Sequence, residues 1–144
     1  MTDKIQQKYR LDFYKKVFKK TAIPIIDIKI FDQYFSFILD TGASHSHIDK
    51  HFYNYILSTY GDPPKGDNMN SVAVGSEQKD SPTVLLPLTI EEEIIDTMFI
   101  VSDLENVVEY TKEKTGLDIE GLLGATFFEF FKWKIDFEKL IVWK

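Results

Sequence analysis

One stretch of the sequence, residues 37–44, constrains the fold more than any other. Phe37 and Leu39 alternate with their neighbours as in a strand with one buried face, and Asp40 follows on the opposite face. Residues 41–44, Thr-Gly-Ala-Ser, then supply hydroxyls, backbone N–H groups and little bulk, which a tight loop around a charged carboxylate requires. The stretch therefore predicts a strand that delivers Asp40 into a tight loop at its end.

A second informative block lies far downstream, at Gly121-Leu122-Leu123-Gly124. Two apolar residues between glycines, followed by the aromatic-rich residues 125–131, predict a buried strand that leads into a short helix. Residues 133–137 alternate next, and residues 140–143 form a terminal strand after a turn at 138–139.

Asp40-Thr41-Gly42-Ala43-Ser44 behind an apolar strand resembles the active-site loop of retroviral-type (retropepsin-like) aspartic proteases. The downstream Leu-Leu-Gly segment and Ile135-Asp136-Phe137 match the same family in order and spacing, so the resemblance covers residues 23–143. It implies a mainly β fold, a closed acid-protease β-barrel with two or three short helices. To this fold the chain adds an N-terminal amphipathic helix.

The resemblance also implies roles for individual residues. Asp40 would be the catalytic carboxylate, Thr41 would hydrogen-bond across a two-fold axis, and Gly42 would let substrate backbone approach closely. Ala43 completes the loop, and Ser44 would support the outer carboxylate oxygen. The loop-packing residues beneath the site would be Leu122, Leu123 and Gly124.

A predicted hairpin between residues 71 and 78 corresponds to the family's substrate-covering flap, with Val74, Gly75 and Ser76 as substrate-binding residues at its tip. This hairpin lacks the glycine-rich tip that many members carry. An ordinary surface hairpin is the alternative interpretation.

Aspartic proteolysis needs two carboxylates that share one proton, and the sequence contains one Asp-Thr-Gly. Asp103 precedes a helix, Asp118 lies in an acidic loop and Asp136 lies in a strand, so none of them has a comparable loop. The expected enzyme is therefore a homodimer in which Asp40 meets its symmetry mate, acting on an extended peptide. No cofactor and no metal are expected.

Composition bounds the remaining possibilities. A chain of 144 residues with 44% hydrophobic and 15% aromatic residues can build one domain with a real core. A net charge of −6 disfavours general nucleic-acid binding. We expect no membrane association and a cytoplasmic location, because the start has no apolar leader and the chain has no cysteine.

The first 20 residues differ from the rest in charge, with seven Lys or Arg against two Asp or Glu. Ile5, Tyr9, Phe13 and Val17 recur every four residues, which predicts an amphipathic helix over 3–20. We therefore divide the chain into a basic N-terminal extension, 1–20, and a protease domain, 21–144. The helix could pack on the domain, contact a partner or membrane surface, or cover the cleft.

The other elements follow from periodicity and turn residues. Helices are expected over 49–60, with Asp49 as N-cap and Gly61 as its end, and over 104–115, with a Ser102–Glu105 capping box and Gly116 as its end. The remaining strands are expected at 23–31, 34–39, 84–90 and 94–101.

Two competing interpretations remain open from the sequence. His45, His47 and His51 fall within seven residues, so a zinc or nickel site with Asp40 or Asp49 as an oxygen ligand is one alternative. The other is a catalytically silent, dimeric interaction domain with the acid-protease fold, since fold does not fix function.

Overall fold

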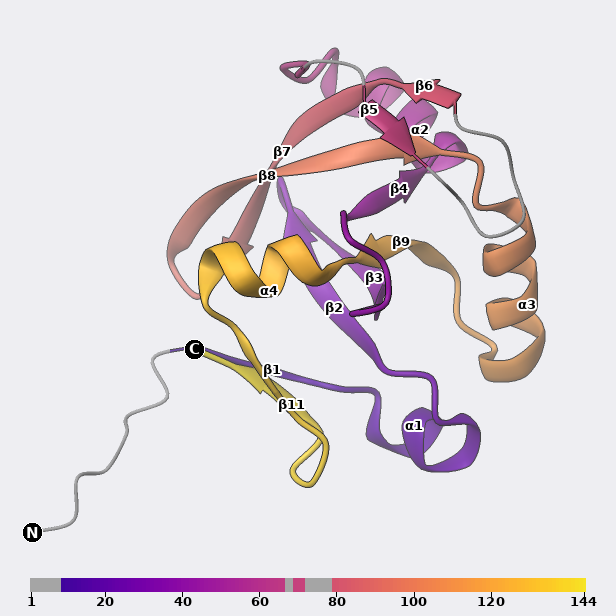
Figure 1. Ribbon diagram of the computed structural model, residues 1–144, viewed down its shortest axis with the longest axis vertical. Helices are drawn as coiled ribbons and strands as arrows, with labels where there is room; N and C mark the ends of the chain where they lie inside the picture. Colours follow the sequence, from indigo (N-terminus) through magenta and orange to yellow (C-terminus); the bar gives the residue numbers. More distant parts are fainter. Residues whose placement is uncertain (1–8, 67–68, 72–78) are drawn as a thin grey trace, which may run out of the picture.

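The protein is known here from a computed structural model that describes residues 9–66, 69–71 and 79–144. A ribbon view shows long β-strands wrapped around a core, with helices at the periphery (Figure 1). The described elements are, in chain order, β1 Arg10–Asp12, α1 Lys15–Thr21, β2 Ile25–Ile30, β3 Gln33–Leu39, β4 His47–Asp49, α2 Lys50–Tyr60, β5 Met69–Ser71, β6 Lys79–Ser81, β7 Thr83–Ile90, β8 Glu93–Ser102, α3 Glu105–Thr115, β9 Ile119–Leu123, α4 Ala125–Phe131, β10 Lys134–Asp136 and β11 Ile141–Trp143.

Six strands close into a barrel in the order β2-β3-β9-β4-β8-β7. Two hairpins supply four of the strands, and their turns fall at Phe31-Asp32 and Glu91-Glu92, where Asp32 and the two glutamates interrupt the alternating apolar pattern. This closed barrel confirms the mainly β, closed-barrel architecture that the sequence predicted.

Alternating side chains fill the barrel. Ile26, Ile28 and Ile30 of β2 are fully buried, whereas Asp27 and Lys29 between them are not. The rings of Phe37 and Phe99, from β3 and β8, lie 5.7 Å apart between centroids. The apolar face of each strand is therefore the inner wall of the barrel.

The most consequential connection joins β3 to β4. Strand β9 lies between them, parallel to β3 and antiparallel to β4. The chain must therefore leave β3, pass over the end of β9 and return as β4 on the other side. Residues 40–46 make this crossing, which places the Asp-Thr-Gly loop at the end of three adjacent strands.

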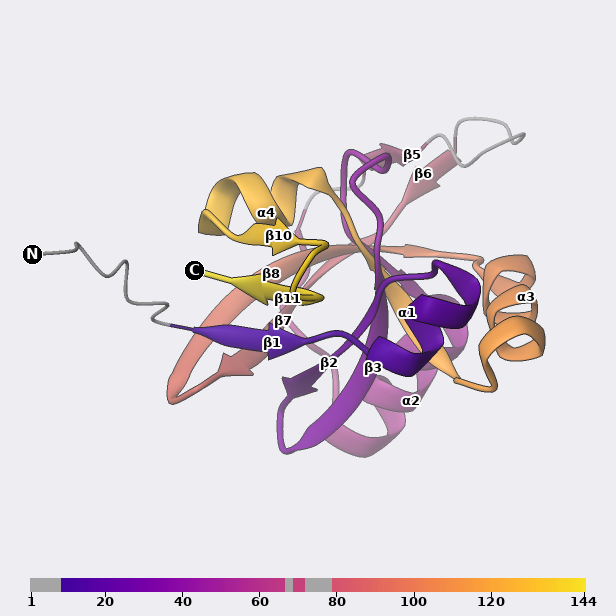
Figure 2. The same cartoon turned by 90° about the horizontal axis from the view of Figure 1, so that it is seen from below.

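A second, three-stranded sheet has the order β1-β11-β10, and Figure 2 shows its strands side by side below α4. It corrects the prediction of one helix over 3–20. Residues 10–12 form a strand, and the helix begins only at Lys15. Residues 1–8 lie outside the described part.

The reason for the correction is a tertiary contact. Leu11 pairs with Val142, and the aromatic residues Tyr9 and Phe13 are buried, so strand pairing with the C-terminal segment overrides the helical spacing. The boundary at residue 20 between extension and domain stays a prediction.

Both ends of helix α2 lie where the sequence predicted them. The Asp49 side chain accepts the backbone N–H of His51 at 3.1 Å, and Gly61 follows the last turn with φ of 89°. Gly116 likewise ends α3 in a left-handed conformation. Among the described residues, no helix is long and apolar enough to cross a membrane.

The predicted capping box at α3 is wrong, since Leu104 is the N-cap and makes no side-chain cap. Asp103 Oδ1 accepts the Glu105 N–H at 3.1 Å instead. Asp103 lies only two residues before Glu105, so its side chain reaches the Glu105 N–H in place of Ser102. The Ser102 hydroxyl contacts His47 Nδ1 at 2.8 Å.

The hairpin expected between residues 71 and 78 is partly described. Strands β5 and β6 pair antiparallel, with Met69 opposite Ser81. The tip residues of the prediction, Val74, Gly75 and Ser76, lie outside the described residues.

Candidate active site

Asp40 lies at the end of β3, where its backbone is fixed and its carboxylate stays accessible. The Asp40 N–H donates to the Leu123 carbonyl at 2.9 Å, which continues the β3–β9 pairing by one residue. The Gly42 N–H donates to Asp40 Oδ1 at 3.1 Å. This local bond orients the carboxylate, so the loop presents a positioned acid at the surface of a single chain.

The loop after Asp40 is bonded to the start of α4. Ala125 N–H donates to the Ala43 carbonyl at 2.7 Å, and Thr126 N–H donates to the Ser44 carbonyl at 3.1 Å. The first amides of a helix have no partner within the helix. Here they hold the Asp40 loop, so loop and helix position each other.

Glycines make this close approach possible. A β-carbon at position 124 would overlap the carbonyl of His45 and lie 2.8 Å from the Ala43 oxygen. A β-carbon at position 42 would lie 3.2 Å from Asp40 Oδ1, tighter than ordinary contact. Glycine is therefore required where β9 passes beneath the loop, and favoured beside the carboxylate.

The structure brings most of the sequence-predicted site residues together. Leu123 is fully buried under the loop, whereas Leu122, pointing to the other face of β9, is partly exposed and lies opposite His47 on β4. Thr41 is exposed, so its proposed contact across a two-fold axis stays a prediction. The Ser44 hydroxyl contacts His45 Nδ1 at 2.8 Å, and its support of the carboxylate also stays a prediction.

The electrostatics of the site include a neighbouring imidazole. Burial lowers the pKa of His47, the charge of His45 lowers it further, and the negative charge of Asp40 partly opposes both. His47 is therefore neutral at neutral pH, and it adds no cationic charge beside Asp40.

The three histidines do not converge on a metal site. His47 Nδ1 contacts the Ser102 hydroxyl, His45 Nδ1 contacts Ser44 and His51 Nδ1 contacts Asp49 Oδ2 at 3.0 Å. In the part of the chain that the structure describes, no three His, Asp or Glu side chains form a group that could hold a metal ion.

Two polar residues near the loop were missed by the sequence interpretation. The buried Ser46 hydroxyl accepts the Gly124 N–H at 3.0 Å and ties the far end of the loop to β9. His47 was considered only as a metal ligand, whereas the structure pairs it with Leu122 and places it within electrostatic range of Asp40. The only sequence signal for Ser46 was a small polar residue beside an apolar strand, and its partner lies 78 residues away.

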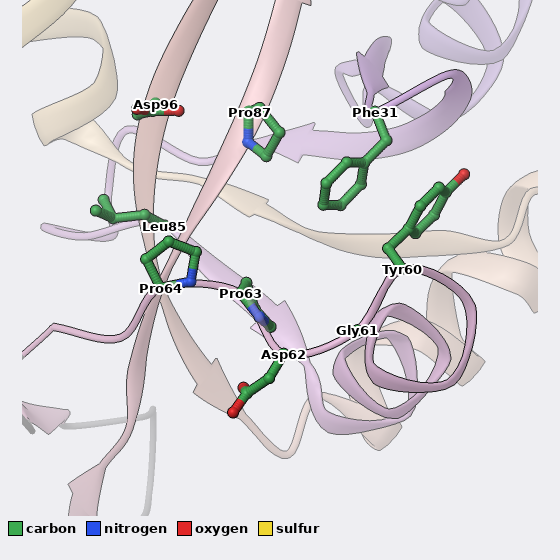
Figure 3. Close-up of a pocket in the computed structure, with 9 residues that line it drawn as sticks. All are labelled: Phe31, Tyr60, Gly61, Asp62, Pro63, Pro64, Leu85, Pro87 and Asp96. Carbon is green, nitrogen blue, oxygen red and sulfur yellow. The ribbon is translucent and has the colours of Figure 1, made fainter.

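A hollow of about 310 Å³ lies elsewhere, between the end of α2 and strands β7 and β8 (Figure 3). The stacked rings of Phe31 and Tyr60, 4.2 Å apart between centroids, form one wall. Pro63, Pro64 and Pro87 also line it. None of the Asp40 loop residues contributes to this hollow, so we do not assign it to the same site.

Solved structures with the same fold are retropepsin-like aspartic proteases. EIAV protease in complex with the inhibitor HBY-793 matches with a TM-score of 0.52 at 19% identity, covering 79% of this chain and 92% of its own. The retroviral protease-like domain of Ddi1 from Leishmania major matches at 0.53 and 15% identity, covering 81% and 82%. A retropepsin-like aspartic protease from Rickettsia conorii matches at 0.55 and 18% identity, covering 93% and 87%.

No family model matches the sequence, and no curated protein matches it. At these identities the likeness concerns the backbone arrangement. The chain has the retropepsin-like fold, which confirms the fold that the Asp-Thr-Gly and Leu-Leu-Gly segments indicated.

Proposed function

We propose that this protein is an aspartic endopeptidase that hydrolyses peptide bonds as a homodimer, with Asp40 of each subunit as the catalytic carboxylate. The observation that carries the proposal is the position of Asp40. It follows β3 directly, its Oδ1 accepts the Gly42 N–H, and its loop crosses the end of β9 above Gly124.

A second chain is needed because the catalytic chemistry requires one ionised and one protonated carboxylate at the same time. Two carboxylates about 3 Å apart share one proton, because both cannot ionise together. The ionised one removes a proton from a water molecule as that water attacks the peptide carbonyl. The protonated one donates a hydrogen bond to the developing oxyanion. A single Asp-Thr-Gly per chain supplies one of the two.

The surroundings of Asp40 are compatible with one proton shared between two Asp40 carboxylates. The loop supplies Gly42 as an amide donor and contains no Lys or Arg, and burial lowers the pKa of His47. An opposite charge close to a carboxylate favours its ionised form, and the loop has no Lys or Arg that would favour ionisation of both carboxylates.

The substrate would be an extended segment of peptide or protein. Strands β5 and β6 would close over it as a flap, with Val74, Gly75 and Ser76 as contacts, and Leu122 and His47 would face it from below. An extended backbone can pair with strand edges while alternate side chains occupy pockets. A cytoplasmic location, and the absence of nucleic-acid or membrane partners, remain parts of the proposal.

The test is cleavage of a denatured protein mixture between about pH 4 and 7, with new termini identified by mass spectrometry. Asp40→Asn keeps the side-chain shape and removes the ionisable group, so it should abolish cleavage. Asp62→Asn, a substitution of an exposed carboxylate in the loop after α2, is the matched control and should leave cleavage unchanged.

New termini from the wild type and Asp62→Asn alone would support the proposal. Equal cleavage by Asp40→Asn would exclude Asp40 as the catalytic group. No cleavage by a wild type of dimeric mass would favour the catalytically silent interaction domain.

A further inference from the structure

We propose that the hollow between the end of α2 and strands β7 and β8 binds the arginine side chain of an extended peptide segment (Figure 3). The hollow combines aromatic and proline-lined walls with an open backbone carbonyl and the carboxylate of Asp96. Binding here needs neither Asp40 nor a second chain, so the hollow is a separate site from the Asp40 loop.

The size and lining of the hollow suit a single side chain. Its volume of about 310 Å³ is at the low end of the range for small-molecule pockets. Leu85 and Pro87 of β7 line one side, and Pro63 and Pro64 of the loop after α2 line another. The three methylene groups of an arginine can pack on such apolar walls while the charged head group stays near water.

The aromatic wall favours a guanidinium group. The rings of Phe31 and Tyr60 are stacked, with 4.2 Å between centroids and an interplanar angle of 14°. The Tyr60 hydroxyl points out of the hollow, where it donates to Asp32. The planar guanidinium of arginine stacks on aromatic faces, whereas the ammonium of lysine is a compact and strongly hydrated charge. This wall therefore selects arginine over lysine.

A proline leaves a backbone acceptor open beside the hollow. Lys65 and Val84 form an antiparallel bridge, and the Leu85 N–H donates to the Pro64 carbonyl at 2.8 Å. In such a pair the N–H of residue 64 normally returns the bond to the carbonyl of residue 85. Pro64 has no N–H. The Leu85 carbonyl therefore lacks this donor and is available to a donor from a ligand.

Asp96 supplies the opposite charge. It lies on β8 opposite Pro87, is exposed, and forms no ion pair with any residue that the structure describes. Asp62, the other acid that lines the hollow, lies 3.5 Å from Lys65 Nζ, and its carboxylate points away from the other lining side chains (Figure 3). No Lys, Arg or His is among the described residues that line the hollow. This charge distribution favours a cationic ligand.

The neighbours of Asp96 favour a peptide over free arginine. Ile94 and Met98 lie two residues to either side of it on β8, and their side chains are 70% and 41% exposed. Residues two apart on a strand share a face, so Asp96 is the centre of an apolar-acid-apolar row. An extended peptide has the same two-residue repeat. An arginine with an apolar residue two positions to either side would therefore match the whole row.

A titration followed by NMR tests the site directly. The labelled Asp40→Asn protein, which would not consume the peptide, is titrated with the acetylated, amidated pentapeptide Leu-Ser-Arg-Ser-Leu. We expect saturable shifts of the Gly61, Leu85 and Asp96 amides, with a dissociation constant of about 1 mM. The Gly42 amide reports separately on any binding beside the Asp40 loop.

Two further peptides test the ligand chemistry. Citrulline in place of arginine keeps the shape and removes the charge, so that peptide should bind at least about tenfold more weakly. Lysine in the same place keeps the charge but loses the planar stacking group, and it should bind about threefold more weakly.

Three substitutions test the assigned groups. Asp96→Asn removes the charge and should weaken arginine binding about tenfold, whereas Asp62→Asn is the matched control and should bind normally. Pro64→Ala supplies an N–H that can bond the Leu85 carbonyl, so it should weaken binding about threefold while the new amide becomes protected from hydrogen exchange. A purely structural role of Pro64 would not produce that protected amide.

Saturable shifts at the hollow that are lost with citrulline and with Asp96→Asn would support the proposal. Equal affinity for the arginine and citrulline peptides, equal weakening by Asp96→Asn and Asp62→Asn, or shifts confined to the Asp40 loop would overturn it. Binding is measured in a protein without the Asp40 carboxylate, so the result is independent of whether the wild type cleaves peptides.

Discussion

Gly124 lies directly beneath His45, close enough that a β-carbon on the glycine would overlap the histidine carbonyl. The contact joins β9 to the loop that carries Asp40, although the two segments are far apart in sequence. It explains why an apolar-apolar-glycine segment belongs with an Asp-Thr-Gly segment. The glycine removes the side chain that would push the loop off the end of the strand.

Gly124→Ala should therefore disturb the loop and the fold together. The overlap involves backbone atoms, which cannot move as a flexible side chain can, so we expect a loss of stability of about 2–3 kcal/mol and a large loss of cleavage. Chemical denaturation and the cleavage assay measure the two effects.

Gly116→Ala is the matched control for that substitution. Gly116 has open space around it and a left-handed φ of 76°, so alanine there should cost only the backbone strain, about 1 kcal/mol, and leave cleavage unaffected. Equal losses for the two substitutions would contradict the importance of the contact with His45.

Glu120 should make the protein less stable as the pH rises. The pKa of this carboxyl is raised from 4.5 to about 7, mainly by burial and to a smaller extent by Asp118 and Asp27, while the Ser36 N–H bond at 2.7 Å opposes the shift. The folded state binds more protons than the unfolded state in this window. The contribution of Glu120 to the free energy of unfolding is therefore fully present below about pH 4.5 and is lost as the pH rises through 7.

Glu120→Gln keeps an acceptor for Ser36 and removes the titration. Relative to the wild type, it should gain about 1–3 kcal/mol at pH 8 compared with pH 4, after allowance for solvent screening of a partly buried group. Urea unfolding at both pH values measures the difference. Glu113→Gln, on the exposed surface of α3, should follow the wild type, and an equal pH slope in both variants would refute the role of Glu120.

The segment before α1 should be essential for stability, contrary to the idea of a separable extension. Phe13 is buried and its ring packs edge-on against Phe18 and Phe137. Phe13→Ala should cost about 3–5 kcal/mol because it removes a large core side chain. Lys16→Ala, on the exposed face of α1, should change stability by less than about 0.5 kcal/mol.

Thermal unfolding followed by near-UV circular dichroism distinguishes these two substitutions. Similar melting temperatures for both would show that residues 9–14 are dispensable. That result would support the division of the chain at residue 20.

Local patterns were enough for most of the barrel. Alternation in residues 25–30 and 83–90 specified strands with one buried face, because a pleated strand turns every second side chain inward. Asp49, Gly61 and Gly116 marked helix ends, since capping depends on residues close in sequence. The small-residue turn at 41–44 indicated the Asp40 loop for the same reason.

Pairing between strands that are far apart in the sequence could not be predicted from such local patterns. Residues 10–12 have helical spacing, yet they form β1 because β11, more than 120 residues later in the chain, offers a partner strand. The Ser46–Gly124 bond and the neutral state of His47 likewise depend on which segments meet in space.

The sequence by itself determined that an acid would lie in a tight loop at a strand end, because the residues that shape such a loop are adjacent along the chain. Only the tertiary structure decided which strand runs beneath that loop and that residues 10–12 pair with β11. Both features depend on the pairing of strands that are far apart in the sequence. The residues that stabilise such pairing are not neighbours along the chain, so no local sequence pattern reveals it.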